Sequence, residues 1–208
     1  MQKDNNFTGS DVRNICREVV HNGFARVIRL AYTYPLFQGG AAAVQDHEVV
    51  MRSNAVVVLP YDPIRDTIVM IRQIRSGLVA CDAAQPWLLE LVAGVCDDEE
   101  EPLEAARREL LEETGLQTSA LSHLASYWVS PGGSTEKIHA YCACVDSTKI
   151  LDIAGLEEEG ENIKVEVFSR VHAMEMLDRG DVSNSASLIC LQWLSRNRMA
   201  LREQFESK

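Results

Sequence analysis

Three glutamates at helical spacing are the residues of this chain that point most directly to chemistry. Glu109, Glu112 and Glu113 stand at positions i, i+3 and i+4, so a helix would place all three on one face. Like charges on one face repel one another, and the dipole of a helix disfavours negative charge near its C-terminal end. A divalent cation would offset this cost, and oxygen ligands suit Mg²⁺ or Mn²⁺. The spacing therefore favours a metal site over the alternative of a solvated acidic helix.

The surrounding residues predict that such a helix exists over 102–114. Pro102 suits a first helical position, because proline lacks the N–H group that a helix start leaves unpaired. Leu103, Ala106 and Leu110 recur at helical spacing and would face a core. Gly115 is placed to end the helix in a left-handed conformation.

The helix lies within a longer pattern of fixed spacing. Gly94 is followed by Glu100, by Arg108-Glu109-Leu110, by Glu112-Glu113 and by Gly115-Leu116. This pattern resembles the signature of the Nudix hydrolases, G-x5-E-x7-R-E-U-x-E-E-x-G-U with U apolar, at every fixed position. The resemblance implies metal-dependent cleavage of a phosphoanhydride bond.

The resemblance extends from about residue 23 to residue 205 and is to the bacterial ADP-ribose pyrophosphatase branch of that family. It implies Mg²⁺-dependent hydrolysis of ADP-ribose to AMP and ribose 5-phosphate, with two or three ions in each site and Mn²⁺ as a substitute. It also implies a homodimer that exchanges its N-terminal β domains and shares its active sites. The segments that carry it are Leu-Pro-Tyr-Asp-Pro-Ile-Arg-Asp at 59–66, Gln-Ile-Arg at 73–75, Pro-Trp-Leu-Leu-Glu-Leu-Val-Ala-Gly at 86–94, Ser-Pro-Gly-Gly-Ser-Thr-Glu at 130–136 and Ala-Ser-Leu-Ile-Cys-Leu-Gln-Trp-Leu at 186–194.

The resemblance also implies roles for individual residues. Glu112 matches a direct or water-mediated metal ligand with a part in catalysis, and Arg108 and Glu100 hold the signature loop against the helix within the catalytic site. Glu159 matches the general base, although the crowding of Glu157, Glu158 and Glu161 around it leaves its register open. The implied metal ligands are the backbone carbonyl of Ala93 and the side chains of Glu109, Glu113 and Glu161; Gly94 and Gly115 are structural positions of the motif.

The implied substrate contacts come from several parts of the chain. Arg75 matches an arginine that contacts phosphate, and Phe24 a position near the adenine. His47 stands where the family pattern suggests an arginine, which would alter affinity or selectivity because histidine can be neutral at pH 7. The remaining implied contacts are Glu48, Arg52, Ser130, Pro131, Gly132 and Glu136.

Composition limits the partners and the cellular location. The formal net charge of -11 disfavours nucleic acid or an anionic membrane as a partner. The chain begins with no apolar signal segment, and no apolar run is long enough to span a bilayer. The six cysteines include no C-x-x-C pair, so we expect reduced thiols in a cytoplasmic protein. The resemblance implies that its partner is a small nucleotide diphosphate sugar.

The order of elements predicts an α/β or α+β protein with a mixed sheet between helices. The resemblance implies an α/β/α Nudix sandwich preceded by a small N-terminal β domain. We expect the β domain at 1–54 and the Nudix domain at 55–208. Within the first domain, residues 1 to about 20 are expected to be a polar lead-in and residues 23–36 a strand. Further strands are expected near 47–51, 55–59, 67–73, 87–93, 121–129, 139–145 and 164–168, and helices at 169–178 and 185–205.

Three other functions remain open from the sequence. A hydrolase of another nucleotide sugar, such as GDP-mannose, would share the metal site and differ in the base pocket. A non-catalytic nucleotide-sensing module on a Nudix fold would tend to lose the signature carboxylates, which this chain keeps. A regulatory protein with a merely acidic surface would form no metal-dependent product.

Overall fold

The computed structural model describes residues 7–118 and 120–206, except for the side chains of residues 159 and 204–206. The chain divides into two compact units. The first contains residues 7–53 and Trp128–Glu136, and the second contains Asn54–Tyr127 and the residues from Lys137 onwards. The sequence placed its domain boundary between residues 54 and 55 and did not anticipate that the loop 128–136 joins the first unit. The division into two domains stays a proposal.

The first unit is built on a three-stranded antiparallel sheet in the order β1-β2-β3. The loop 128–136 is attached to it by backbone hydrogen bonds, from Val50 N–H to the Gly133 carbonyl at 2.9 Å and from Thr135 N–H to the Val50 carbonyl at 3.1 Å. The prediction of a polar lead-in was wrong, because its residues from 13 onwards belong to β1. Its elements are the 3-10 turn η1 Gly9–Asp11 and the strands β1 Arg13–Asn22, β2 Arg26–Thr33 and β3 Gln45–Met51.

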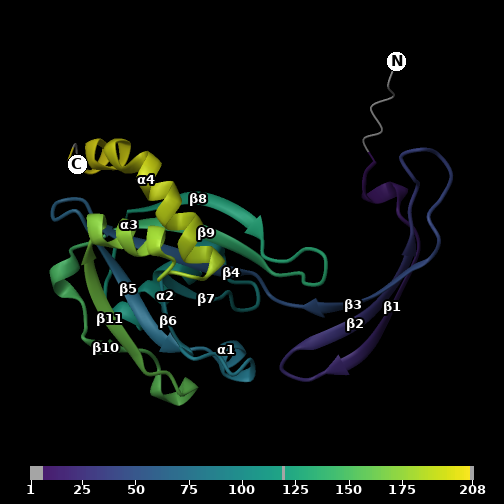
Figure 1. The fold of residues 1–208 in the computed structure, drawn as a ribbon, viewed down its shortest axis with the longest axis horizontal. Helices are drawn as coiled ribbons and strands as arrows, with labels where there is room; N and C mark the ends of the chain where they lie inside the picture. Colours follow the sequence, from purple (N-terminus) through teal and green to yellow (C-terminus); the bar gives the residue numbers. More distant parts are fainter. Residues whose placement is uncertain (1–6, 119, 207–208) are drawn as a thin grey trace. The chain divides into compact units, whose positions relative to one another are not determined.

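The second unit is a mixed sheet between helices (Figure 1). The strand order is β10-β11-β5-β4-β9-β8, with β6 paired to β5 and β7 paired to β4. Strands β4 and β9 run parallel, whereas β4 with β7 and β5 with β6 and β11 run antiparallel. The strands are β4 Ala55–Asp62, β5 Thr67–Ile74, β6 Trp87–Glu90, β7 Val92–Val95, β8 Leu121–Trp128, β9 Lys137–Cys144, β10 Ile153–Ala154 and β11 Ile163–Ser169; the helices are α1 Ser76–Ala80, α2 Pro102–Thr114, α3 Arg170–Arg179 and α4 Ser185–Glu206, with 3-10 turns η2 Ser147–Lys149 and η3 Glu157–Glu159.

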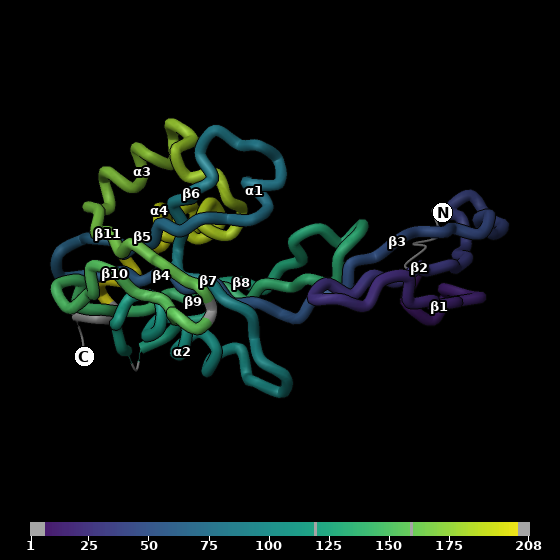
Figure 2. Tube along the Cα trace, turned by 90° about the horizontal axis from the view of Figure 1, so that it is seen from below, coloured from purple at the N-terminus to yellow at the C-terminus, as the bar shows by residue number. Residues whose placement is uncertain are grey.

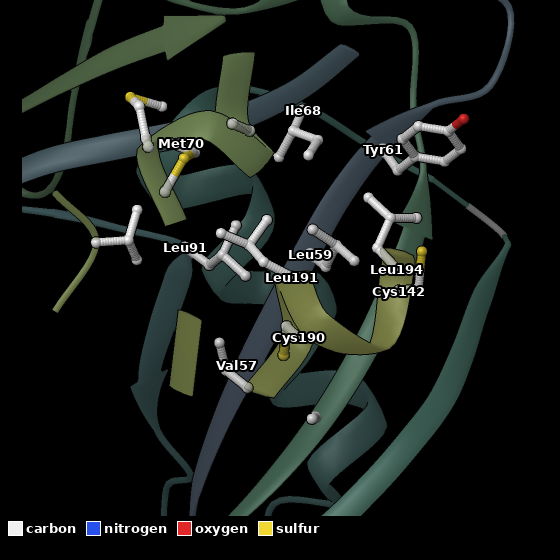
Figure 3. Packing of buried hydrophobic residues seen from close by; sticks show 14 of the residues in the cluster. Val57, Leu59, Tyr61, Ile68, Met70, Leu91, Cys142, Cys190, Leu191 and Leu194 are labelled. Carbon is white, nitrogen blue, oxygen red and sulfur yellow. The ribbon is translucent and has the colours of Figure 1, made fainter. Parts of the chain in front are cut away.

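Helices cover both faces of this sheet, so the predicted α/β/α sandwich is confirmed. Figure 2 shows α3 and α2 on opposite sides of the strands. The apolar run of the central strand β4 is continuous because both faces of the strand are buried. Val57 and Leu59 pack towards α3 and α4, whereas Val56 and Val58 pack towards α2. Figure 3 shows Leu191 of α4 among the buried residues of the first of these two faces. In the part of the chain that the structure describes, no helix is long and apolar enough to cross a membrane.

Candidate active site

The helix that carries the signature glutamates begins and ends where the sequence predicts. Pro102 is its first residue, and Gly115 follows its last residue with φ 75° and ψ 0°. The Gly115 N–H donates to the Leu111 carbonyl at 2.8 Å, which closes the last turn. Leu110 and Ala106 are buried against the sheet, so α2 is fixed by its apolar face.

Arg108 joins the signature loop to α2. Its Nε and Nη2 donate to the two carboxylate oxygens of Glu100 at 3.0 and 2.9 Å, and Nη2 also donates to the Val95 carbonyl at 3.1 Å. Its Nη1 donates to Glu109 at 2.8 Å and to Glu112 at 3.1 Å. One guanidinium therefore holds the loop and partly neutralises two of the clustered carboxylates.

Gly94 leaves room for the carboxylate of Glu109. A Cβ atom added at Gly94 would lie 1.9 Å from Glu109 Cδ and 1.9 Å from its Oε1. The carboxylate thus rests directly against the backbone of β7. Any side chain at position 94 would push it away.

Glu113 is a buried carboxylate, 2% exposed. The Ala93 N–H donates to its Oε2 at 3.0 Å, and Gln73 Nε2 donates to its Oε1 at 3.3 Å. Burial raises the pKa of Glu113 to about 8 despite the Ala93 N–H and the positive charge of Arg75, and the negative charges of Glu109 and Glu161 add to the increase. An ionised Glu113 therefore needs a compensating cation.

The acidic loop is attached to the C-terminal part of α2. The Gly155 N–H donates to the Glu112 carbonyl at 3.1 Å, and the Leu156 N–H donates to Glu161 Oε2 at 3.1 Å. Gly155 has φ +96°, and a Cβ there would lie 2.8 Å from the Cβ of Glu161. Burial raises the pKa of Glu109 against the effect of Arg108, and Glu112 and Glu161 raise it further. The structure thus brings Glu161 within electrostatic reach of the α2 glutamates.

The clustered carboxylates are paired with protein donors rather than arranged around a common centre. Among the residues that the structure describes, no group of three or more His, Cys, Asp or Glu side chains is arranged to hold a metal ion. Arg108 donates hydrogen bonds to Glu109 and Glu112, and Gln73 donates one to Glu113. A cation bound among these oxygens would replace the contacts from Arg108 and Gln73.

The general base predicted at position 159 is untested. The backbone of Glu159 belongs to η3, but its side chain lies outside the described part of the chain, so its role stays a prediction. Glu157 and Glu158 are exposed, and they line a cavity of about 440 Å³ beside the loop. The assignment of the general base to Glu159, rather than to Glu157 or Glu158, therefore rests on the sequence alone.

A larger cavity, of about 530 Å³, is lined mainly by residues of α2 and of the signature loop. Its lining includes Glu100 and Arg108 of the signature, together with Arg107 and Thr118. This lining does not include the glutamates predicted to bind metal, which are Glu109, Glu112, Glu113 and Glu161.

Arg75 and a residue that the sequence did not single out form a pair in the second unit. Arg75 follows β5, and its Nε donates to Glu90 Oε2 at 2.5 Å. Glu90 is 7% exposed and ends β6. The signal for Glu90 was present in the sequence, since it is the one charged residue in the apolar run Leu88-Leu89-Glu90-Leu91-Val92.

The other predicted substrate contacts belong to the first unit. Phe24 is fully exposed, and Arg52 is held through its backbone, whose N–H donates to Thr135 Oγ1 at 2.8 Å. The loop 128–136 turns tightly, since the N–H groups of Gly133 and Ser134 both donate to the Ser130 carbonyl. The other contacts predicted in this unit are Glu48 on β3 and Pro131, Gly132 and Glu136 in the loop, and all of these roles stay predictions.

Comparison with known proteins identifies the family of this chain. The family described as NUDIX domain matches residues 51–190. The ADP-ribose pyrophosphatase of Haemophilus influenzae is 35% identical over 99% of this chain and 96% of its own length, and that of Escherichia coli (strain K12) is 38% identical over 96% and 95%. The GDP-mannose pyrophosphatase of Yersinia enterocolitica is 30% identical over 88% and 94%. A solved structure titled as an ADP compounds hydrolase superimposes with a TM-score of 0.69 over 92% of this chain and 96% of that chain, and at 21% identity it supports the fold alone.

Proposed function

The chain belongs to the NUDIX family, and we propose that it hydrolyses the diphosphate of ADP-ribose to AMP and ribose 5-phosphate. It is a hydrolase of pyrophosphate bonds. Relatives named ADP-ribose pyrophosphatase are 35% to 38% identical over nearly the whole chain, whereas those named GDP-mannose pyrophosphatase are 30% identical over less of it. This difference favours ADP-ribose as the substrate.

The donor set fits a divalent cation. Glu109, Glu112, Glu113 and Glu161 supply carboxylate oxygens, which Mg²⁺ and Mn²⁺ prefer, and Ala93 would add its carbonyl. The burial of the Glu113 carboxylate is the observation that supports this fit, because a nearby cation would stabilise its buried negative charge. We propose two or three Mg²⁺ ions, replaceable by Mn²⁺; when bound, they would neutralise phosphate charge and make a water molecule more acidic.

The side chains of this protein then have separate tasks. Arg75 orients the diphosphate, because a guanidinium can donate two parallel hydrogen bonds to phosphate oxygens. Arg108 keeps the signature loop on α2 through Glu100. Glu159 accepts a proton from the water whose oxygen bonds to one phosphorus while the bridging P–O bond breaks. The two products leave as AMP and ribose 5-phosphate.

The first unit contributes the remaining substrate contacts in this proposal. Phe24 stacks on the adenine, and Glu48 and Arg52 contact the substrate from β3 and the residue that follows it. The loop from Ser130 to Glu136 shapes the pocket. The exposure of Phe24 supports its role, because an exposed aromatic ring is free to stack on a base.

We further propose a cytoplasmic homodimer whose subunits share residues of the active site. The first unit supports the dimer, since every residue of β1 is exposed, including Ile15, Val19 and Val20. Apolar side chains on an exposed strand are suited to burial against a second copy of the chain. Sedimentation analysis should give twice the mass of one chain, and a monomer that retains full activity would contradict the shared site.

The carboxylate cluster of α2 and the acidic loop, in which Glu113 is buried, is the observation that carries the proposal. The test is incubation with ADP-ribose, GDP-mannose, NADH and ATP, with Mg²⁺ or with a chelator, followed by identification of products. We expect AMP and ribose 5-phosphate from ADP-ribose, only when Mg²⁺ is present. Faster release of GMP from GDP-mannose would support the alternative substrate, and binding without any product would support a sensing module.

A further inference from the structure

Glu90 is a buried charge whose position needs an explanation. Its side chain is 9% exposed, and burial raises its pKa although the neighbouring guanidinium of Arg75 lowers it. Burying a carboxylate costs free energy that one ion pair often fails to recover. A chain that needed only a packed β6 would be better served by an apolar residue here, so the carboxylate indicates another role.

Both oxygens of Glu90 are held. Oε2 accepts from Arg75 Nε at 2.5 Å, and Oε1 accepts from Asn184 Nδ2 at 3.2 Å. Asn184 is itself fixed, because its Oδ1 accepts from the Ser187 N–H at 2.7 Å in the first turn of α4. Ser187 in turn accepts from the Leu91 N–H at 2.8 Å, which joins α4 to the residue after Glu90. The carboxylate therefore has one orientation set by backbone elements.

The side chain of Arg75 is partly exposed, and among the described residues one hydrogen bond, from its Nε, joins it to this network. Its side chain is 39% exposed, and only its Nε is used; the described residues give its two Nη groups no hydrogen-bond partner. Its positive charge also acts on Glu113 of the carboxylate cluster. A long side chain held at Nε keeps the two Nη groups of its guanidinium available for two oxygens of a phosphate group.

We propose that Glu90 is a positioning residue that fixes the guanidinium of Arg75, so that the Nη groups are presented to the diphosphate of the substrate. The inference rests on the proposed function for the identity of that diphosphate. It adds a residue outside the signature and outside the substrate contacts assigned above. Glu90 acts through Arg75 and does not itself touch the substrate.

The test is Glu90→Gln combined with Arg75→Ala in a double-mutant cycle. The amide of glutamine can accept from only one of the two donors that now face Glu90, so Arg75 loses its charged partner. We expect KM for ADP-ribose to rise about ten-fold with kcat within about two-fold, since the contact to phosphate is made before and during the reaction. In the Arg75→Ala background, Glu90→Gln should change KM by less than about two-fold.

Glu166→Gln is the matched control. Glu166 pairs with Arg72 at 2.9 Å across β11 and β5 and with Lys164 at 3.1 Å, so the same chemical change weakens an arginine–glutamate pair that is assigned no role in the site. Its KM should match that of the wild type. A ten-fold effect of Glu90→Gln that persists in the Arg75→Ala background, or a similar effect of Glu166→Gln, would overturn the positioning role.

A spectroscopic measurement separates this inference from the proposed function. In ¹⁵N spectra of the arginine Nε–H groups, the resonance that disappears in Arg75→Lys should shift and exchange faster with solvent in Glu90→Gln. This readout needs no turnover. An unchanged resonance would overturn the role of Glu90, whereas a wild-type protein that releases no AMP from ADP-ribose would overturn the proposed function.

Discussion

Replacing Gly94 with alanine tests the carboxylate site through a single added methyl group. Gly94 lies in β7 without a positive φ, so alanine fits the backbone there. The new Cβ would lie 1.9 Å from both Cδ and Oε1 of Glu109 and 2.4 Å from its Oε2. Because the obstructing atoms are the end of a flexible side chain, the fold can absorb the change by moving that carboxylate.

The size of the movement gives the size of the effect. Carbon atoms in ordinary contact lie about 3.5 Å apart or more, so the carboxylate carbon must retreat by about 1.6 Å. A displacement of about 1 Å in a reacting group costs roughly 100-fold in rate, or about 2.7 kcal/mol of transition-state stabilisation. We therefore expect kcat/KM for ADP-ribose to fall at least about 100-fold, with the free energy of unfolding changed by less than about 1 kcal/mol.

The assay is Mg²⁺-dependent release of AMP, with thermal unfolding measured on the same samples. Gly9→Ala is the control, because a Cβ at Gly9 meets no atom within 4 Å. In a Glu109→Gln background, Gly94→Ala should have little further effect, since both changes remove the same ligand. A Gly94→Ala variant that keeps more than about a third of the wild-type rate would refute the reasoning that links Gly94 to the position of Glu109.

Three further predictions concern single carboxylates. In the presence of a chelator, the free energy of unfolding should fall as pH rises from 5 to 8, because Glu113 has a pKa of about 8 in the folded protein and 4.5 in the unfolded chain, which therefore releases the proton first. Glu113→Gln should make this dependence on pH weaker. Thermal unfolding at several pH values measures it, and an equal dependence in the variant and the wild type would contradict the prediction. Burial raises the pKa of Asp62, but hydrogen bonds from Arg65 and Ser147 outweigh it and hold the pKa below 3.8. Asp62→Asn should therefore lower the free energy of unfolding by about 2 kcal/mol at pH 7, and by less at pH 3, where the stabilisation by the ionised carboxylate is being lost. Urea unfolding at pH 7 and pH 3 measures the loss of stability, and an equal loss at the two pH values would show that the charge of Asp62 does not contribute. Glu159→Gln should lower kcat more than Glu158→Gln does, and the reverse order in steady-state kinetics would move the base by one residue.

Much of the second unit could be predicted because its elements differ clearly in hydrophobic pattern. The run at 55–59 is apolar throughout because β4 is buried on both faces, and the boundaries of α2 follow from Pro102 and Gly115. The first unit was harder to predict. Strand β1 has the sequence Arg-Asn-Ile-Cys-Arg-Glu-Val-Val-His-Asn, with every residue exposed, and it is stabilised by its pairing with β2 rather than by burial.

The site shows a similar limit. Residue spacing predicted that the signature glutamates share a helix face, and the loop that carries Glu161 joins them through contacts between backbone groups. Spacing along the chain could not show that Glu90 pairs with Arg75, because that contact depends on the register of β5 and β6 and on the cap of α4. Nor could it show that Arg108 donates to Glu109 and that Gln73 donates to Glu113.

The central claim is that the acids of α2 and the acidic loop hold the ions used in cleavage. The most direct measurement is anomalous diffraction from crystals soaked in Mn²⁺ with a non-hydrolysable ADP-ribose analogue. We expect peaks within bonding distance of Glu109, Glu113 and Glu161, with Arg108 and Gln73 displaced from them. Crystals that bind the analogue without any such peak, and in which those glutamates keep their present hydrogen bonds, would contradict the account.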